Sequence, residues 1–179
     1  YHGETVGALA VTDVPIFRDA YAPLLREGLV TPFPGKAGSL DALARLLSER
    51  HREIAALIVE PLVQGASGMR MYHPAFLARA RELTQQHDVL LIADEIMTGF
   101  GRTGTLFACE QEDVAPDFLC LAKGLTAGYL PMAATLAPET IWNAFLGTHA
   151  ERRTFFHGHT YGGNPLAAAR SEEHTSELQ

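Results

Sequence analysis

Apolar residues follow two spacings along this chain, and each spacing predicts a different kind of element. Short unbroken apolar runs are typical of strands buried on both faces. Between these runs, apolar residues recur every three or four positions, as they do in amphipathic helices. The two spacings together predict helices over Thr5–Val11, Leu40–His51 with Ser39 as N-cap, Pro74–His87 and Pro138–Phe145, and strands over Ile54–Val59, Val89–Ala93, Asp117–Ala122 and Met132–Leu136.

The alternation of strands with helices predicts the fold class. It is typical of βαβ units, so we expect an α/β fold with a mostly parallel sheet that helices cover on both faces. Ligands of such sheets bind at the carboxyl ends of the strands. Glu60, Asp94 and Lys123 each lie at the end of a predicted strand. We therefore expect these three charged side chains along one edge of the sheet.

Both ends of the chain depart from this pattern. The first residue is Tyr1 rather than Met, so we expect a preceding stretch of protein. After Ala169, an Ala-rich apolar stretch changes abruptly to the polar string RSEEHTSELQ. This string resembles the in-frame translation of a sequencing-adapter oligonucleotide. We expect residues 1–169 to be part of one large domain and residues 170–179 to be a non-native read-through tail.

Composition argues against several classes of function. The formal net charge is −7 and no basic stripe is present, so nucleic acid is not an expected partner. Cys109 and Cys120 lack the spacing of metal ligands, and His157 and His159 lack a third ligand, so we expect no metal site. The apolar runs are too short for a membrane span, and no signal segment opens the chain. The expected location is a reducing cytoplasm.

Residues Gly99–Gly104 read G-F-G-R-T-G, which matches the glycine spacing of a dinucleotide-binding fingerprint. In that fingerprint the first glycine lies at the turn between a strand and a long helix. Here Asp94–Thr98 separates the strand from the glycines, and a short polar piece containing Pro116 follows them. The context therefore argues against a nicotinamide or flavin site.

An amine nucleophile has only two candidates, because Lys36 and Lys123 are the only lysines. Lys36 lies in a loop rich in Gly and Pro. Lys123 follows a strand, where partial desolvation would keep its amine neutral and nucleophilic. Asp94 ends the preceding strand and is suited to keep a pyridine nitrogen protonated, which turns the ring into an electron sink. The alternative is that Asp94 and Glu95 cap a helix while Lys123 is a solvated loop residue.

Two motifs together, residues 91–104 (LIADEIMTGFGRTG) and Ala122-Lys123-Gly124, strongly resemble the signature of class III aminotransferases. The resemblance covers residues 1–169. It implies part of a pyridoxal-phosphate-binding large domain of fold type I, in a homodimer that acts on small-molecule substrates. It also implies that Lys123 is the catalytic residue that binds pyridoxal 5′-phosphate covalently. The other implied cofactor contacts are Asp94 at the pyridine nitrogen, Ile96 and Tyr1 on the two ring faces, Thr160 at the cofactor phosphate of the neighbouring subunit and His159 beside it, and the implied substrate contacts are Tyr1, Lys123 and Gly158.

Two positions depart from the class members that act on ornithine or 4-aminobutyrate. Those enzymes resemble one another in a Pro-x-Gln-Gly-Glu stretch whose acid pairs with a substrate-site arginine, whereas Ala66 stands there in this chain. Met97 replaces a glutamine near the cofactor. Both departures resemble the branch of the class that serves biotin synthesis with S-adenosylmethionine as amino donor. The alternatives are another ω-amine or pyruvate-dependent aminotransferase, or an inert truncated product.

Overall fold

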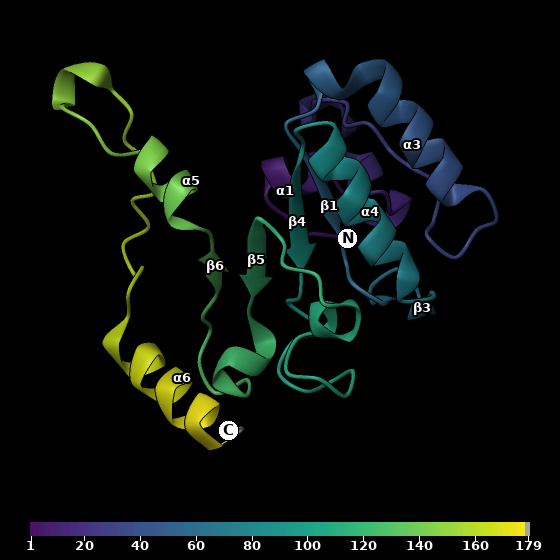
Figure 1. The fold of residues 1–179 in the computed structure, drawn as a ribbon. Helices are drawn as coiled ribbons and strands as arrows, with labels where there is room; N and C mark the ends of the chain where they lie inside the picture. Colours follow the sequence, from purple (N-terminus) through teal and green to yellow (C-terminus); the bar gives the residue numbers. More distant parts are fainter. Residues whose placement is uncertain (178–179) are drawn as a thin grey trace.

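A four-stranded sheet forms the centre of the chain in a computed structural model that describes the backbone of residues 1–177 and the side chains of residues 1–172 (Figure 1). Its strand order is β1-β4-β5-β6, and β2 and β3 form a separate hairpin. The strands are β1 (Ala56–Val59), β2 (Val63–Gln64), β3 (Arg70–Met71), β4 (Leu90–Asp94), β5 (Phe118–Leu121) and β6 (Ala134–Leu136). The α-helices are α1 (Val6–Ala10), α2 (Pro15–Arg18), α3 (Ser39–Arg50), α4 (Ala75–Gln86), α5 (Glu139–Ala144) and α6 (Pro165–Glu177), and the 3-10 helices are η1 (Asp19–Leu24), η2 (His51–Glu53), η3 (Ala108–Glu112), η4 (Lys123–Thr126) and η5 (His149–Glu151).

The predicted α/β fold with a mostly parallel sheet is confirmed. Strands β1, β4 and β5 are parallel, with Ile58 paired to Ile92 and Ile92 paired to Phe118. Strand β6 runs antiparallel to β5, which the sequence pattern did not predict. A parallel return needs a long crossover that usually contains an α-helix. The connection from β5 to β6 contains only the short helix η4, so the chain turns back beside β5.

The start of α3 differs from the prediction that Ser39 caps it. Gly38 is the N-cap, with a left-handed φ of 75°, and Ser39 is the first helical residue. The Ser39 hydroxyl donates to the carbonyl oxygen of Pro34 at 2.9 Å instead of accepting from the helix. The left-handed backbone conformation favours glycine. Gly38 therefore occupies the bend, and Ser39 follows as the first residue of the helix.

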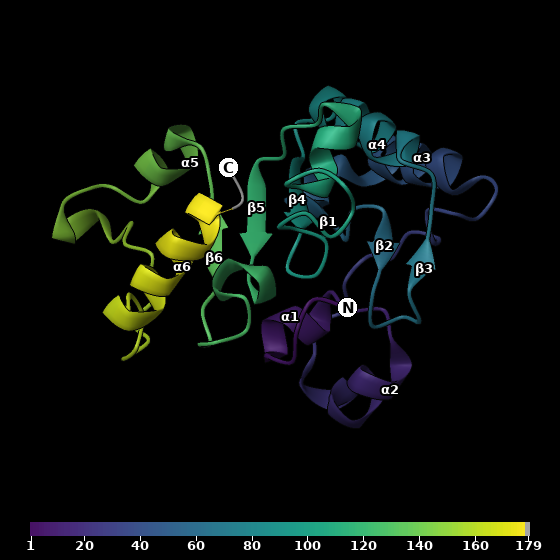
Figure 2. The ribbon, with the colours of Figure 1, turned by 90° about the horizontal axis from the view of Figure 1, so that it is seen from below.

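The core lies between one face of the sheet and helices α3 and α4. These two helices lie side by side over β1 and β4 (Figures 1 and 2). Their apolar residues at helical spacing face the sheet, as predicted. The buried cluster comprises Leu43 and Leu47 of α3, Phe76, Leu77, Ala80 and Leu83 of α4, Val59, Leu91 and Ala93 of the strands, and Tyr72, Val89, Cys109 and Val114 of the connections.

The opposite face of the sheet is only partly covered by the residues that the structure describes. Because side chains alternate along a strand, Ile58, Leu90 and Ile92 point away from α3 and α4. Leu90 is 37% exposed, and both isoleucines are half-buried. The expectation that helices cover both faces is therefore met on one face within the described part of the chain.

The last part of the described chain, from β6 through α5 to α6, extends away from the α3–α4 layer (Figure 1). Large apolar side chains on this arm are exposed, including Trp142, Phe155 and Phe156. Helix α6 runs from Pro165 to Glu177, so the expected boundary between residues 169 and 170 lies within a continuous helix.

A partly buried ion pair links α4 to the start of β5. Arg81 donates to both carboxylate oxygens of Asp117, at 2.6 and 3.2 Å, and the Leu91 N–H donates to the same carboxylate at 2.7 Å. Burial by itself would raise the pKa of Asp117. The hydrogen bonds from Arg81 and Leu91 and the charge of Arg81 outweigh it, so the pKa lies below its ordinary value of 3.8.

Asp117→Asn should destabilise the protein near pH 7 by about 1.5–3 kcal/mol, the range for hydrogen bonds to charged groups. Since the folded-state pKa is lowered, this stabilisation is present above the ordinary pKa and is lost as the pH falls through the folded-state value. Urea unfolding of wild type and variant at pH 7 and at acidic pH measures it, with the exposed Asp13 replaced by Asn as control. An equal difference in stability at both pH values would contradict the assignment.

Candidate active site

The three charged residues predicted at strand ends lie along the carboxyl edge of the parallel strands. Glu60 follows β1, Asp94 ends β4, and Lys123 follows β5 as the first residue of η4. Since these strands are neighbours in the order β1-β4-β5, the edge presents an acid, an acid and an amine in that order. The N-terminus and α1 lie beside the same edge (Figure 2).

Asp94 is a buried carboxylate with a partner on each oxygen. Its side chain is 6% exposed. One oxygen accepts from the Ile96 N–H at 3.2 Å, and the other lies 2.7 Å from Nδ1 of His2. The backbone N–H of His2 donates to the Thr12 hydroxyl at 3.0 Å, which holds the histidine in place. Sequence reasoning missed His2, and its position directly after Tyr1 was the only available signal.

Glu60 ties the N-terminal segment to the β2–β3 hairpin. One carboxylate oxygen lies 3.1 Å from the backbone nitrogen of Tyr1, and the other accepts from the Gly65 N–H at 2.9 Å. The Tyr1 ring packs on Phe17 with 4.7 Å between ring centroids. Tyr1 therefore lies near the carboxyl edge of the sheet, and its implied contact with the cofactor ring stays a prediction.

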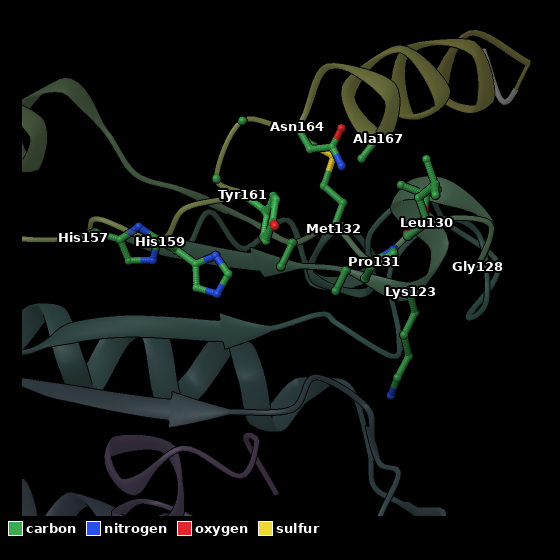
Figure 3. Close-up of a pocket in the computed structure, with 15 residues that line it drawn as sticks. Lys123, Gly128, Leu130, Pro131, Met132, His157, His159, Tyr161, Asn164 and Ala167 are labelled. Carbon is green, nitrogen blue, oxygen red and sulfur yellow. Dashed lines mark hydrogen bonds between the residues drawn. The ribbon is translucent and has the colours of Figure 1, made fainter.

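Lys123 differs from the expected partly desolvated lysine, because its side chain is exposed. It lines a cavity of about 960 Å³ together with Met132, His159 and Asn164. Figure 3 shows its side chain extending away from His159. Its backbone has a positive φ of 28°, which is unusual for a residue other than glycine.

The predicted site residues fall into two groups in the described chain. One group lies around the end of β4 and comprises Tyr1, Asp94 and Ile96. The other group lines the cavity beside η4 and comprises Lys123 and His159. No residue of the first group lines that cavity. The remaining two, Gly158 and Thr160, lie in the same exposed segment as His159 but do not line the cavity. The implied contact of Thr160 with a neighbouring subunit stays a prediction.

Other chemistries receive no support from the described residues. The glycines of residues 99–104 do not open a helix, since turns follow β4 until η3 begins at Ala108. Burial raises the pKa of the Cys109 and Cys120 thiols, which disfavours a nucleophilic thiolate. In the described part of the chain, no group of three or more His, Cys, Asp or Glu residues could hold a metal ion. Likewise, no helix described here is long and apolar enough to cross a membrane.

Comparison with known proteins shows which family this chain belongs to. The family model described as "Aminotransferase class-III" matches residues 1–178. The chain belongs to the class III aminotransferase family.

Three known proteins similar to this chain are especially informative. The chain is 45% identical over 183 residues to adenosylmethionine-8-amino-7-oxononanoate aminotransferase of Geobacter sulfurreducens, covering 94% of this chain and 40% of the relative. The crystal structure of the Methanocaldococcus jannaschii enzyme of that name superposes with a TM-score of 0.95 at 38% identity, covering 99% of this chain and 42% of the other. The ornithine aminotransferase of Toxoplasma gondii superposes with a TM-score of 0.85 at 33% identity, covering 99% and 38%. The chain thus spans about two fifths of the length of the proteins it matches.

The family uses pyridoxal 5′-phosphate, and the residues at the carboxyl edge fit this cofactor. A buried carboxylate that accepts from Ile96 and His2 suits a protonated ring nitrogen, because it supplies a fixed negative charge away from water. A primary amine at the end of the next strand suits an aldehyde. The Asp94 carboxylate and the Lys123 amine therefore have the chemistry that the cofactor requires.

Proposed function

We propose that the full-length protein containing this sequence transfers an amino group from S-adenosylmethionine to 8-amino-7-oxononanoate, giving 7,8-diaminononanoate for biotin synthesis. The similarity to relatives with adenosylmethionine-8-amino-7-oxononanoate in their names supports this proposal. The observation that carries it is the absence of an acid at Ala66. We further propose that the active form is a cytoplasmic homodimer, that residues 1–169 are its partial cofactor-binding domain, and that residues 170–179 are a non-native tail.

Each proposed role follows from the chemistry of the side chain. Bound pyridoxal 5′-phosphate supplies an aldehyde that takes up the amino group and a ring that accepts electrons. Lys123 would hold the cofactor covalently, and its free amine would move a proton as general base and acid. Asp94 keeps the ring nitrogen protonated. The remaining proposed contacts are Ile96 and Tyr1 on the ring faces, Thr160 and His159 near the phosphate of the neighbouring subunit's cofactor, and Gly158 and Tyr1 beside the substrate.

The two departures from the ornithine-type pattern lie next to each other in the fold. Ala66 is exposed in the turn of the β2–β3 hairpin, directly after Gly65. A Cβ atom added at Gly65 would lie 3.1 Å from the Cε of Met97, so the methionine packs directly beneath this turn. Met97 also packs against Leu62 and Val63 of the hairpin. An apolar side chain therefore supports the turn, and the turn presents no carboxylate.

The lack of a carboxylate in this turn leads to a prediction about which substrates the enzyme converts fastest. Because Ala66 offers no acid to the substrate-site arginine expected in the rest of the protein, that arginine stays available for the carboxylate of 8-amino-7-oxononanoate. The full-length enzyme should convert 8-amino-7-oxononanoate with S-adenosylmethionine, and should use ornithine or 4-aminobutyrate with 2-oxoglutarate poorly. Rates measured under the same conditions test this order. Ala66→Glu should lower the first activity, because the new carboxylate would compete for the arginine.

The control for that variant is Ser67→Glu, which adds the same charge one position further along the turn. It should affect the rate with 8-amino-7-oxononanoate less than Ala66→Glu does. The opposite order of substrates would overturn the specific reaction while leaving membership of the class intact.

A second proposal concerns the isolated 179 residues, which we expect to be inactive. In them the Lys123 amine is exposed, and the cavity that it lines includes neither Tyr1 nor Asp94. Turnover in a covalently assisted reaction requires the reacting groups in one fixed arrangement. The same assays on the isolated chain test this, and turnover comparable to that of the full-length enzyme would contradict it.

A further inference from the structure

The glycine-rich loop Gly99–Phe107, which the proposed function leaves without a role, packs against the backbone beside Lys123. A Cβ atom added at Gly124 would lie 2.8 Å from the Cβ and 2.8 Å from the Cδ2 of Phe100. The Phe100 side chain therefore lies directly against the backbone of Gly124. The Phe107 ring packs edge-on against the Phe100 ring, with 5.8 Å between the ring centroids.

A fully buried acid anchors this loop at both ends. The Glu95 side chain has no exposed surface, and its carboxylate accepts from the N–H groups of Ala108 and Cys109 at 2.7 and 2.8 Å. It also accepts from the Thr98 hydroxyl at 3.1 Å, while the Glu95 carbonyl accepts from the Gly99 N–H at 3.0 Å. A buried charge with this many donors is well satisfied, so it fixes where the loop starts and where it ends.

The backbone that Phe100 covers is strained at the reactive residue. Lys123 has a φ of 28°, in the region that favours glycine, and Gly124 follows it directly. Such conformations persist only where the surrounding packing imposes them, and they occur most often at functional sites. The close contact between Phe100 and Gly124 supplies packing of this kind one residue from the strain.

We propose that Phe100 is a positioning residue, which acts through Gly124 to set the backbone of Lys123 and hence the direction of its amine. Glu95 keeps Phe100 in place by anchoring the loop. This assigns the glycine-rich string a role in orienting the lysine rather than in binding a dinucleotide. The inference rests on the proposed function, in which Lys123 is the reactive amine.

The test compares Gly124→Ala, Phe100→Leu and the double variant Gly124→Ala with Phe100→Ala in the full-length enzyme. Two readouts are independent of turnover. The first is the rate at which cofactor-free enzyme attaches pyridoxal 5′-phosphate to Lys123, trapped by borohydride. The second is competitive acetylation of Lys123 relative to Lys36, read by peptide mapping. Thermal unfolding reports whether each variant is folded, and Gly7→Ala is the matched control, because a Cβ there meets nothing within 4 Å.

Gly124→Ala should slow attachment at Lys123 by about 10²-fold, the effect expected of a displaced reactive group. It should also change the ratio of Lys123 to Lys36 acetylation. The double variant should attach the cofactor about tenfold faster than Gly124→Ala, because removal of the Phe100 ring relieves the overpacking. Phe100→Leu, which keeps the apolar bulk, should change the ratio with little change in unfolding temperature.

Unchanged attachment and an unchanged ratio in a folded Gly124→Ala enzyme would overturn the proposal, as would a double variant no faster than Gly124→Ala. If Gly124→Ala does not fold, a Phe100→Leu enzyme with an unchanged acetylation ratio would also overturn the proposal. Failure of the wild-type enzyme to attach pyridoxal 5′-phosphate at Lys123 would instead refute the proposed function, while the acetylation ratios would still test the positioning by Phe100.

Discussion

Lys123→Ala should reduce turnover of the full-length enzyme by at least about 10²–10⁴-fold, since loss of a general acid and base alone has an effect of that size. The same substitution removes the proposed covalent anchor of pyridoxal 5′-phosphate. Steady-state rates measure the first effect, and borohydride reduction followed by peptide mapping measures the second. In the wild-type enzyme the label should be found at Lys123.

The matched control is Lys36→Ala, which removes the chain's other lysine. Lys36 is exposed in the loop that precedes α3, away from the strand ends that carry Asp94 and Lys123. Its replacement should leave both the rate and the label unchanged. Label on Lys36, or a Lys123→Ala enzyme with near-native turnover, would show that the amine has been assigned to the wrong residue.

Asp94→Asn should lower turnover by about 10²–10³-fold, the loss typical when one preorganised electrostatic contact is removed. Asparagine has nearly the same shape, and its amide oxygen can still accept from the Ile96 N–H, so the local fold should survive. What would be lost is the negative charge that we propose keeps the ring nitrogen protonated. Turnover and cofactor binding, measured on the same preparation, separate a chemical effect from failure to bind.

His2 provides the sharpest check on this assignment, because its Nδ1 lies 2.7 Å from the Asp94 carboxylate. His2→Phe removes the donor and should lower turnover, whereas His2→Asn offers an amide donor near the position of Nδ1 and should retain more. Near-native turnover of Asp94→Asn would disprove the pairing with the ring nitrogen.

Local sequence determined the elements of this fold and the position of its charged residues within them. The alternation of apolar runs and helical spacing predicted β1, β4, β5, α3 and α4, because burial of one face imposes a period of about two or 3.6 residues on the chain itself. Parallel strands end at one edge, so the pattern also placed Glu60, Asp94 and Lys123 there. The class III motifs around Asp94 and Lys123 then indicated the family.

Tertiary structure alone decided which side chains meet. His2 reaches Asp94 across 92 residues of sequence, Glu95 closes a loop through backbone N–H groups, and Phe100 covers Gly124. None of these contacts leaves a periodic signal, because each depends on where two distant segments pack. The exposed Lys123 and the antiparallel β6 have the same cause: solvent access and strand direction are set by neighbouring segments and connections, not by the local apolar pattern.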